Sequence, residues 1–170
     1  MEILKNFLKS DAFLVALAVG IPSGVTVGSL EGDFLWYGGG AVFGFFSGLY
    51  FFLYSEKFRL LKFIPWIIAS DASFYSAVWV YLHTPDYVLR GFGTAASGFV
   101  GVSIVLVAFH LLVSRLSWRI AIFLLVVGTL IPVPFLWSGT GKYLYPLFIV
   151  WQTAALAIFG YALFLKKTEK

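Results

Sequence analysis

Six long runs of apolar residues divide the chain, and each run ends at charged residues, glycine or proline. A run of about 20 apolar residues in a helix spans the ~30 Å hydrocarbon core of a bilayer. The runs are continuous rather than alternating in polarity, so they predict helices and not the strands of a β-barrel. We therefore expect one all-α domain over residues 1–170, a polytopic membrane protein with six transmembrane helices. The predicted helices cover approximately Asp11–Leu30, Phe34–Tyr54, Phe63–Leu82, Gly91–Val113, Trp118–Trp137 and Tyr143–Leu165.

The composition also indicates a membrane protein. Hydrophobic residues make up 61% of the chain and charged residues only 12%, whereas a soluble domain has about 25% charged residues. A chain with so few charges cannot cover a water-facing surface with polar side chains. The N-terminal segment has the basic start and apolar core of a signal peptide, but we expect it to be retained as the first helix. The sequence contains no basic run of the kind that binds nucleic acid, so we expect no nucleic-acid partner.

Lysine and arginine are distributed unevenly between the predicted loops. With six crossings, ten of the twelve basic residues fall on the side of the two termini, and only Arg90 and Lys142 fall on the other side. Loops rich in lysine and arginine stay on the cytoplasmic side of a membrane. We therefore expect both termini to be cytoplasmic, and we expect the protein to lie in the cytoplasmic membrane of a prokaryote. One helix more or fewer would scatter the basic residues over both sides, so their distribution also favours the count of six.

Small residues recur at four-residue spacing in several predicted helices. Such a row lies along one helix face and lets another helix backbone approach closely. One interpretation is packing within this chain. The other is docking onto a partner membrane subunit or a second copy, for which the first helix is the best candidate because its row is the longest. The rows are Ala12, Ala16, Gly20, Gly24 and Gly28 in the first helix, Gly40, Gly44 and Gly48 in the second, and Gly93, Ser97 and Gly101 in the fourth.

Proline residues interrupt two of the apolar runs. Pro22 lies inside the first predicted helix, so we expect that helix to be kinked or broken there. Pro132 and Pro134 predict that the fifth helix bends or ends near the outer face of the membrane.

Asp71 is the only carboxylate near the middle of a predicted transmembrane helix. A charge at that depth costs about 2.5–3.5 kcal/mol on insertion scales, and such residues turn toward protein partners. Other polar side chains lie at a similar depth when residues are counted along the helix axes, and Tyr75 follows Asp71 by one turn. The predicted ligand or proton site comprises Asp71, Gln152, Ser23, Thr129, Ser97 and Tyr75, with Trp151 as a further wall. The structural alternative is an acid that burial keeps protonated, or one that bonds to Gln152 or a serine.

Few other residues offer chemistry. The chain has no cysteine, which excludes disulfides and thiolate metal sites. His83 and His110 lie too far apart to form a zinc set or the paired axial ligands of a b-type haem, so we expect no metal and no cofactor. His110 lies roughly two turns from the middle of the fourth helix. It is a further candidate for a proton or ligand role, and a plain interfacial histidine is the alternative. No nucleophile elbow, phosphate loop or paired-carboxylate motif is present, so no catalytic residue is assigned and an enzyme is disfavoured.

Three hypotheses about function remain. The first is transport or small-molecule binding at the midplane polar site around Asp71. The second is a non-catalytic subunit of a larger membrane complex, packed through its glycine and aromatic faces. The third is an enzyme that acts on a lipid or a quinone. The predicted architecture is similar to that of the substrate-binding subunits of energy-coupling vitamin transporters. The shared features are the small size, the six helices, the two cytoplasmic termini and the small-residue row on the first helix. This resemblance is one of architecture and implies ligand binding and a partner subunit.

Overall fold

The protein is all-helical. The computed structural model describes residues 2–30, 32–55, 57–84, 86–133 and 144–168, and all regular structure within these ranges is helical. This confirms the prediction of an all-α protein. The elements are α1 (Glu2–Leu8), α2 (Asp11–Gly28), α3 (Gly32–Tyr54), α4 (Leu60–His83), α5 (Asp86–Ala108), the π-helical turn η1 (Phe109–Val113), α6 (Trp118–Leu130) and α8 (Leu144–Thr168).

Four helical stretches are long and apolar enough to cross a membrane. They are Asp11–Gly28, Leu60–His83, Phe92–Val113 and Pro146–Thr168. Two shorter helical stretches, Gly38–Tyr54 and Trp118–Leu130, are also apolar. Large apolar side chains lie exposed on the surfaces of these helices; Leu61 is 91% exposed and Leu111 is 69% exposed. Monomeric soluble proteins rarely expose apolar surface on this scale, so the surface indicates a protein that lies in a bilayer.

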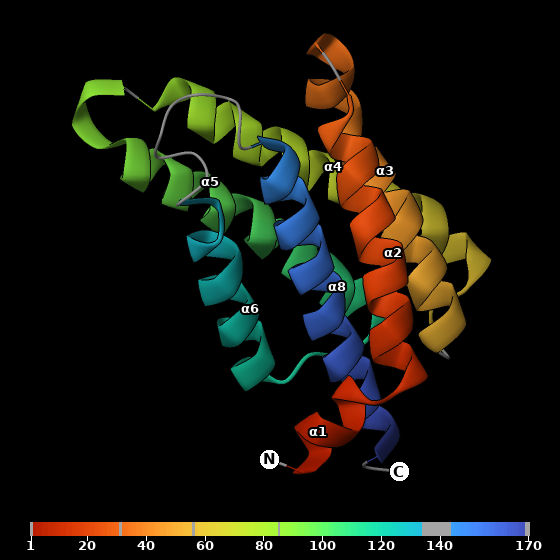
Figure 1. Cartoon of the computed structure of the whole chain (residues 1–170). Coiled ribbons are helices and arrows are strands. Elements are labelled where there is room, and N and C mark those ends of the chain that lie inside the picture. The colour runs from red at the N-terminus through yellow and green to blue at the C-terminus, as the bar shows by residue number, and fades with distance from the viewer. Residues whose placement is uncertain (1, 31, 56, 85, 134–143, 169–170) are drawn as a thin grey trace.

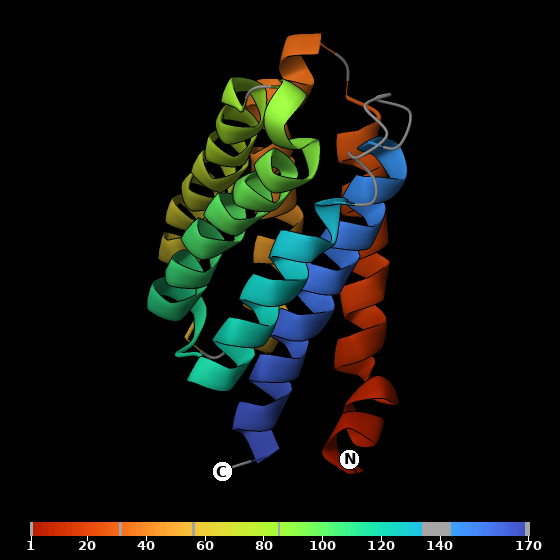
Figure 2. The same cartoon turned by 90° about the vertical axis from the view of Figure 1, so that its left-hand side faces the viewer.

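From α2 to α6, each long helix runs antiparallel to the next and packs beside it (Figure 1). The packing order is α2, α3, α4, α5 and α6, and α8 then lies along α2 to complete the bundle. Both termini lie at the same end of the molecule (Figure 2). The ring contact between Phe7 and Phe164, with centroids 5.6 Å apart, joins α1 to the last turns of α8 at that end. Helix α6 packs extensively on α5 and makes only sparse contact with α8.

Helix boundaries follow local signals at several points. Ser10 separates α1 from α2 and caps α2, because its Oγ accepts a hydrogen bond from the Phe13 N–H at 3.4 Å. The predicted break at Pro22 is wrong, since α2 runs without interruption from Asp11 to Gly28 with Pro22 exposed on its surface. A proline removes one backbone hydrogen bond and need not end a membrane helix. The fifth predicted helix does end early: α6 stops at Leu130, and Pro134 lies outside the described residues.

The centre of the bundle near the termini is an aromatic cluster. Trp66 of α4 and Phe51 of α3 are fully buried, with ring centroids 5.0 Å apart. Phe109 of η1 stacks on Phe159 of α8 at 4.3 Å. These four rings bring α3, α4, η1 and α8 together, and buried aromatic pairs add to the energy of apolar burial. The Trp66 Nε1 donates to Ser47 Oγ at 2.8 Å, which satisfies the one polar atom of the indole.

The small-residue rows pack against helices of this chain. A Cβ added to Gly20 would lie 2.7 Å from the Thr153 Cα on α8, and one added to Gly40 would lie 2.5 Å from the Asp71 Cα on α4. Gly24 is similarly close to the backbone of α8, and Gly44 to the backbone of α4. Side chains at these positions would push the helices apart, so the glycines set the α2–α8 and α3–α4 distances.

Candidate functional site

Asp71 lies in the middle of α4, on the side that faces α3. Its Oδ1 accepts a hydrogen bond from the backbone N–H of Ala41 at 3.0 Å. The absence of a side chain at Gly40 allows this approach, since the Gly40 and Asp71 backbones are in direct contact. The carboxyl group is partly exposed at the edge of the α3–α4 interface. An acid at membrane depth therefore has a specific protein partner, which is a backbone amide and not a serine or Gln152.

Within the described ranges, only one oxygen of the Asp71 carboxyl group has a hydrogen-bond partner. Among the residues that the structure describes, none donates a hydrogen bond to Oδ2 or forms an ion pair with Asp71. A carboxylate has about four lone-pair positions, so one N–H leaves most of its capacity unused. The preceding residue, Ser70, is 2% exposed and its Oγ has no hydrogen-bond partner either. Unused polar capacity at this depth can be satisfied by a proton, a cation or a ligand that donates a hydrogen bond.

A second polar contact joins α2 to α8. The Ser23 Oγ donates to the Gln152 Oε1 at 2.5 Å, and the two residues are 0% and 1% exposed. This contact brings together two residues that depth alone had predicted to be neighbours. Thr153 lies against Gly20 beside them, and its Oγ1 is buried without a hydrogen-bond partner.

The remaining predicted polar residues do not join either contact. The Ser97 Oγ donates to the Thr94 carbonyl at 2.8 Å, and the Thr129 Oγ1 donates to the Leu125 carbonyl at 2.6 Å, each within its own helix. Tyr75 is 48% exposed on the outer surface of α4. The predicted set is thus divided over separate helix interfaces, and these contacts do not place Asp71 and Gln152 in one cluster. Short hydroxyl side chains in helices often bond to the preceding turn in this way.

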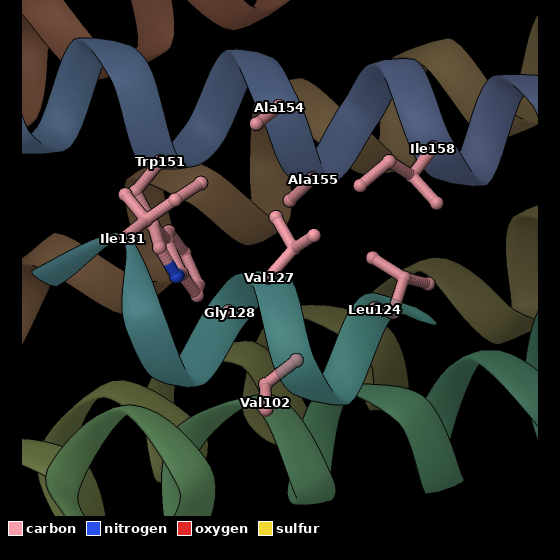
Figure 3. A pocket seen from close by; sticks show the side chains of 9 residues that line it. All are labelled: Val102, Leu124, Val127, Gly128, Ile131, Trp151, Ala154, Ala155 and Ile158. Carbon is pink, nitrogen blue, oxygen red and sulfur yellow. The ribbon is translucent and has the colours of Figure 1, made fainter. Parts of the chain in front are cut away.

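Trp151 lies on an apolar groove between α5, α6 and α8 (Figure 3). Its indole ring lies tilted against the ring of Phe43 on α3, with centroids 5.6 Å apart. The groove holds about 220 Å³ of space free of protein atoms, including the part that is open to the outside. Its lining residues are Val102, Leu124, Val127, Gly128, Ile131, Trp151, Ala154, Ala155 and Ile158. Trp151 therefore forms the wall of an apolar groove, while Asp71 lies at the α3–α4 interface.

His110 is exposed in η1, near the end of the bundle that holds the termini. Its Nδ1 accepts a hydrogen bond from the Leu116 backbone N–H at 3.3 Å, which holds the turn between η1 and α6. The contact gives His110 a local structural partner.

Two lysines near η1 form contacts that sequence reasoning missed. The Lys62 Nζ donates to the Leu112 carbonyl at 2.9 Å, and the Lys166 Nζ donates to the Ser114 Oγ at 3.1 Å. The Ser55 Oγ donates to the Val113 carbonyl at 3.1 Å. Lys62 and Ser55 thus satisfy carbonyls at the end of a helix that have no intrahelical partner, whereas Lys166 bonds to the Ser114 hydroxyl. A π-helical turn has no clear pattern in the sequence, so nothing indicated that these carbonyls would be available.

No group of three or more histidine, aspartate or glutamate side chains that could hold a metal ion occurs within the described ranges. A comparison with models of protein families, with curated proteins and with solved structures finds no match for this chain. The site therefore has to be interpreted from its own chemistry.

Proposed function

We propose that this chain is an integral membrane protein that binds a proton or a small cationic or hydrogen-bonding molecule at Asp71. The observation that carries the proposal is the Asp71 carboxyl group, which lies mid-helix with one backbone N–H on Oδ1 and no donor to Oδ2 among the described residues. In this proposal all six apolar helical stretches cross the bilayer, so both termini lie on the same side. The excess of lysine and arginine at that side supports a cytoplasmic location for the termini, in the cytoplasmic membrane of a prokaryote.

The energetics favour a functional group over a passive one. One hydrogen bond to a charged group contributes about 1.5–3 kcal/mol, which leaves little or no surplus over the roughly 2.5–3.5 kcal/mol that a charge costs at the centre of a membrane. A proton or a cation bound at the carboxyl group would lower that cost. Either species would bind at Oδ2. Replacement of the proton by a cationic ligand there would couple ligand binding to proton release.

Labelling with dicyclohexylcarbodiimide tests the site directly. This apolar reagent reacts with protonated carboxyl groups inside membranes. We expect labelling of the protein in lipid nanodiscs at Asp71, detected by peptide mass spectrometry, and loss of that label in Asp71→Asn. Asp11→Asn, which removes an exposed acid at the start of α2, should leave the label on Asp71 unchanged.

Ligand chemistry can be probed with tetraphenylphosphonium, a membrane-soluble cation. The cation should slow the labelling of Asp71 if the carboxylate pairs with positive charge. Labelling that is unaffected by the cation but falls as pH rises would assign Asp71 to proton binding alone. If Asp71 is not labelled at any pH, although the protein is folded, the carboxyl group is inaccessible and the proposal fails.

A partner subunit is the second candidate, and one feature of the same surface favours it. Tyr75 is 48% exposed one turn from Asp71, and a Cβ added to Gly38 of α3 would meet nothing within 4 Å. A partner helix that carries a cation could reach the Asp71 carboxylate there, as charged groups in membranes pair with one another. Native mass spectrometry from a gentle detergent would then show a second chain whose retention depends on Asp71.

A further inference from the structure

Two lysine side chains from different helices converge on the turn that ends η1. Lys62 of α4 donates to the Leu112 carbonyl at 2.9 Å, and Lys166 of α8 donates to the Ser114 Oγ at 3.1 Å. Leu112 and Ser114 are two residues apart, so their Cα atoms lie within about 7 Å of each other. Both lysines are partly buried, while Arg115, the next residue of the turn, is exposed. We call these three cationic residues, Lys62, Arg115 and Lys166, the basic turn.

The positive charge of the basic turn has no counter-charge in the part of the chain that the structure describes. No carboxylate in those ranges forms an ion pair with any of its three residues. An ammonium group has three N–H donors, so each lysine has capacity left beyond its one bond to the protein. Like charges held close together repel one another, and partial burial reduces the screening by water. An anion at the turn would offset this repulsion and accept the remaining N–H donors.

Apolar side chains beside the basic turn indicate that the anion carries acyl chains. Leu111 and Trp118, which lie on either side of the turn in the chain, are each 69% exposed. The Arg119 guanidinium carbon lies 5.6 Å from the centroid of the Trp118 ring. Exposed tryptophan and arginine side chains are typical of the headgroup level of a bilayer. A phospholipid places its phosphate at this level, and its acyl chains would cover Leu111 and Ile122, which is 51% exposed.

We propose that the basic turn binds the phosphate of an anionic phospholipid such as phosphatidylglycerol. The phosphate oxygens accept hydrogen bonds from Lys62 and Lys166, and Arg115 reaches the headgroup from the exposed side. A zwitterionic lipid carries its own cation next to the phosphate, so it leaves the charge of the turn unbalanced. This site rests on the membrane location proposed above but not on a role for Asp71, so its failure would leave the Asp71 site untouched.

The test is binding of phosphatidylglycerol to the protein in an uncharged detergent, measured by native mass spectrometry over a lipid titration. We expect saturable binding, and phosphatidylcholine should not bind at the same concentrations. Lys166→Met keeps the apolar stem and removes one charged donor, so the dissociation constant should rise about tenfold. Lys5→Met is the matched control, because Lys5 is exposed on α1, which packs on α2 and α8. It removes the same charge and should leave the dissociation constant unchanged.

A second variant keeps the test decisive if Lys166→Met does not fold. Arg115→Gln removes a charge from the exposed side of the turn and should weaken binding roughly fivefold. Equal binding of the two lipids, or a dissociation constant that is unchanged in the folded variant, overturns the proposal. An equal loss of affinity in Lys5→Met also overturns it, because binding would then depend on net charge alone.

The deacylated headgroup, glycerophosphoglycerol, distinguishes a lipid from a soluble phosphodiester. It lacks the acyl chains that would cover the apolar side chains beside the turn, so it should displace phosphatidylglycerol only at a much higher concentration. Displacement at an equal concentration would show that the turn binds the phosphodiester without regard to its chains, and the assignment to a phospholipid would be wrong.

Discussion

At the scale of single residues, whether a polar side chain needs a partner on another helix depends on whether its own helix can satisfy its hydrogen bonds. Serine and threonine hydroxyls can bond to a carbonyl one turn back in their own helix, as Ser97 and Thr129 do. Such residues need no partner on another helix, so their depth in the membrane does not predict a cluster. The Gln152 amide is larger and has both donor and acceptor groups, and its Oε1 takes its partner, Ser23, from α2.

The Ser23–Gln152 pair should contribute measurably to stability. Ser23→Ala leaves the Gln152 Oε1 buried without a donor, so the free energy of unfolding should fall by about 0.6–2 kcal/mol. Gln152→Leu in the same background should restore part of that loss, because both polar partners are then gone. Unfolding in mixed detergent micelles, followed by circular dichroism, gives the required double-mutant cycle.

Ser103→Ala is the matched control for this cycle. The Ser103 Oγ donates only to the Phe99 carbonyl of its own helix at 2.7 Å, so its removal should change the unfolding free energy by less than about 0.5 kcal/mol. If Ser23→Ala and Ser103→Ala cost the same, the buried pair contributes nothing beyond a helical serine.

At the scale of elements, the apolar runs predicted the long helices closely and missed what depends on tertiary contacts. The predicted Phe63–Leu82 appears as α4, and its central residue Asp71 is mid-helix as expected. The short helix α1, Glu2–Leu8, was not predicted, because seven residues carry too little periodicity. Phe7 holds it in place, since this ring is 2% exposed among aromatic residues of α2 and α8. Such a contact cannot be read from the pattern of residues 2–8 alone.

Two glycines in neighbouring helices should respond differently to the same substitution. A Cβ at Gly24 would lie 2.7 Å from the Ile149 backbone nitrogen, so Gly24→Ala should force α2 and α8 apart and lower the unfolding free energy by about 1–3 kcal/mol. Gly38→Ala meets open space, so removing a flexible glycine from α3 should be neutral or should add about 0.5–1 kcal/mol. Thermal unfolding in detergent would show whether the two midpoints move in opposite directions. Equal shifts would mean that the α2–α8 contact is looser than the structure indicates.

The end of η1 should depend on one lysine. Lys62→Met keeps the apolar stem and removes the donor to the Leu112 carbonyl, so residues 109–117 should open more easily. A hydrogen bond from a charged donor contributes about 1.5–3 kcal/mol, which corresponds to amide exchange that is faster by tenfold or more. Hydrogen–deuterium exchange with mass spectrometry measures this, and Lys57→Met, which removes an exposed lysine from the same loop region, is the control. Unchanged exchange in Lys62→Met would show that the carbonyl does not need the lysine.

At the scale of the whole molecule, the order of helices around the bundle explains why the polar residues form separate contacts. Helix α8 packs on α2, so Gln152 meets Ser23, while Asp71 faces α3. Short loops predict that neighbours in the chain are antiparallel, but they do not predict where the last helix lies. That position depends on the glycines of α2 and on the aromatic rings of α8, Phe159 among them, which pack only after both helices have formed.

The proposed topology can be tested because the chain has no cysteine, so any single cysteine is a unique label. Leu30 and Thr84 follow the C-terminal ends of α2 and α4, whereas Lys57 and Ser117 lie in turns at the opposite end, where the termini are. With six crossings and cytoplasmic termini, cysteines at 30 and 84 should react with a membrane-impermeant maleimide on intact cells, and cysteines at 57 and 117 only after permeabilisation.

The four positions distinguish the possible errors in this topology. If the pattern is reversed, α3, α4 and α5 still cross, and either the orientation inferred from the basic residues is wrong or α2 does not cross. Lys57→Cys and Ser117→Cys test whether α4 and α5 cross, because these two helices lie between them in the chain. If these two cysteines react from opposite sides, one of the two helices does not cross. If Leu30→Cys and Thr84→Cys are labelled from opposite sides, then either α3 or α4 does not cross the membrane. Six crossings require that each pair react from one side and that the two pairs react from opposite sides.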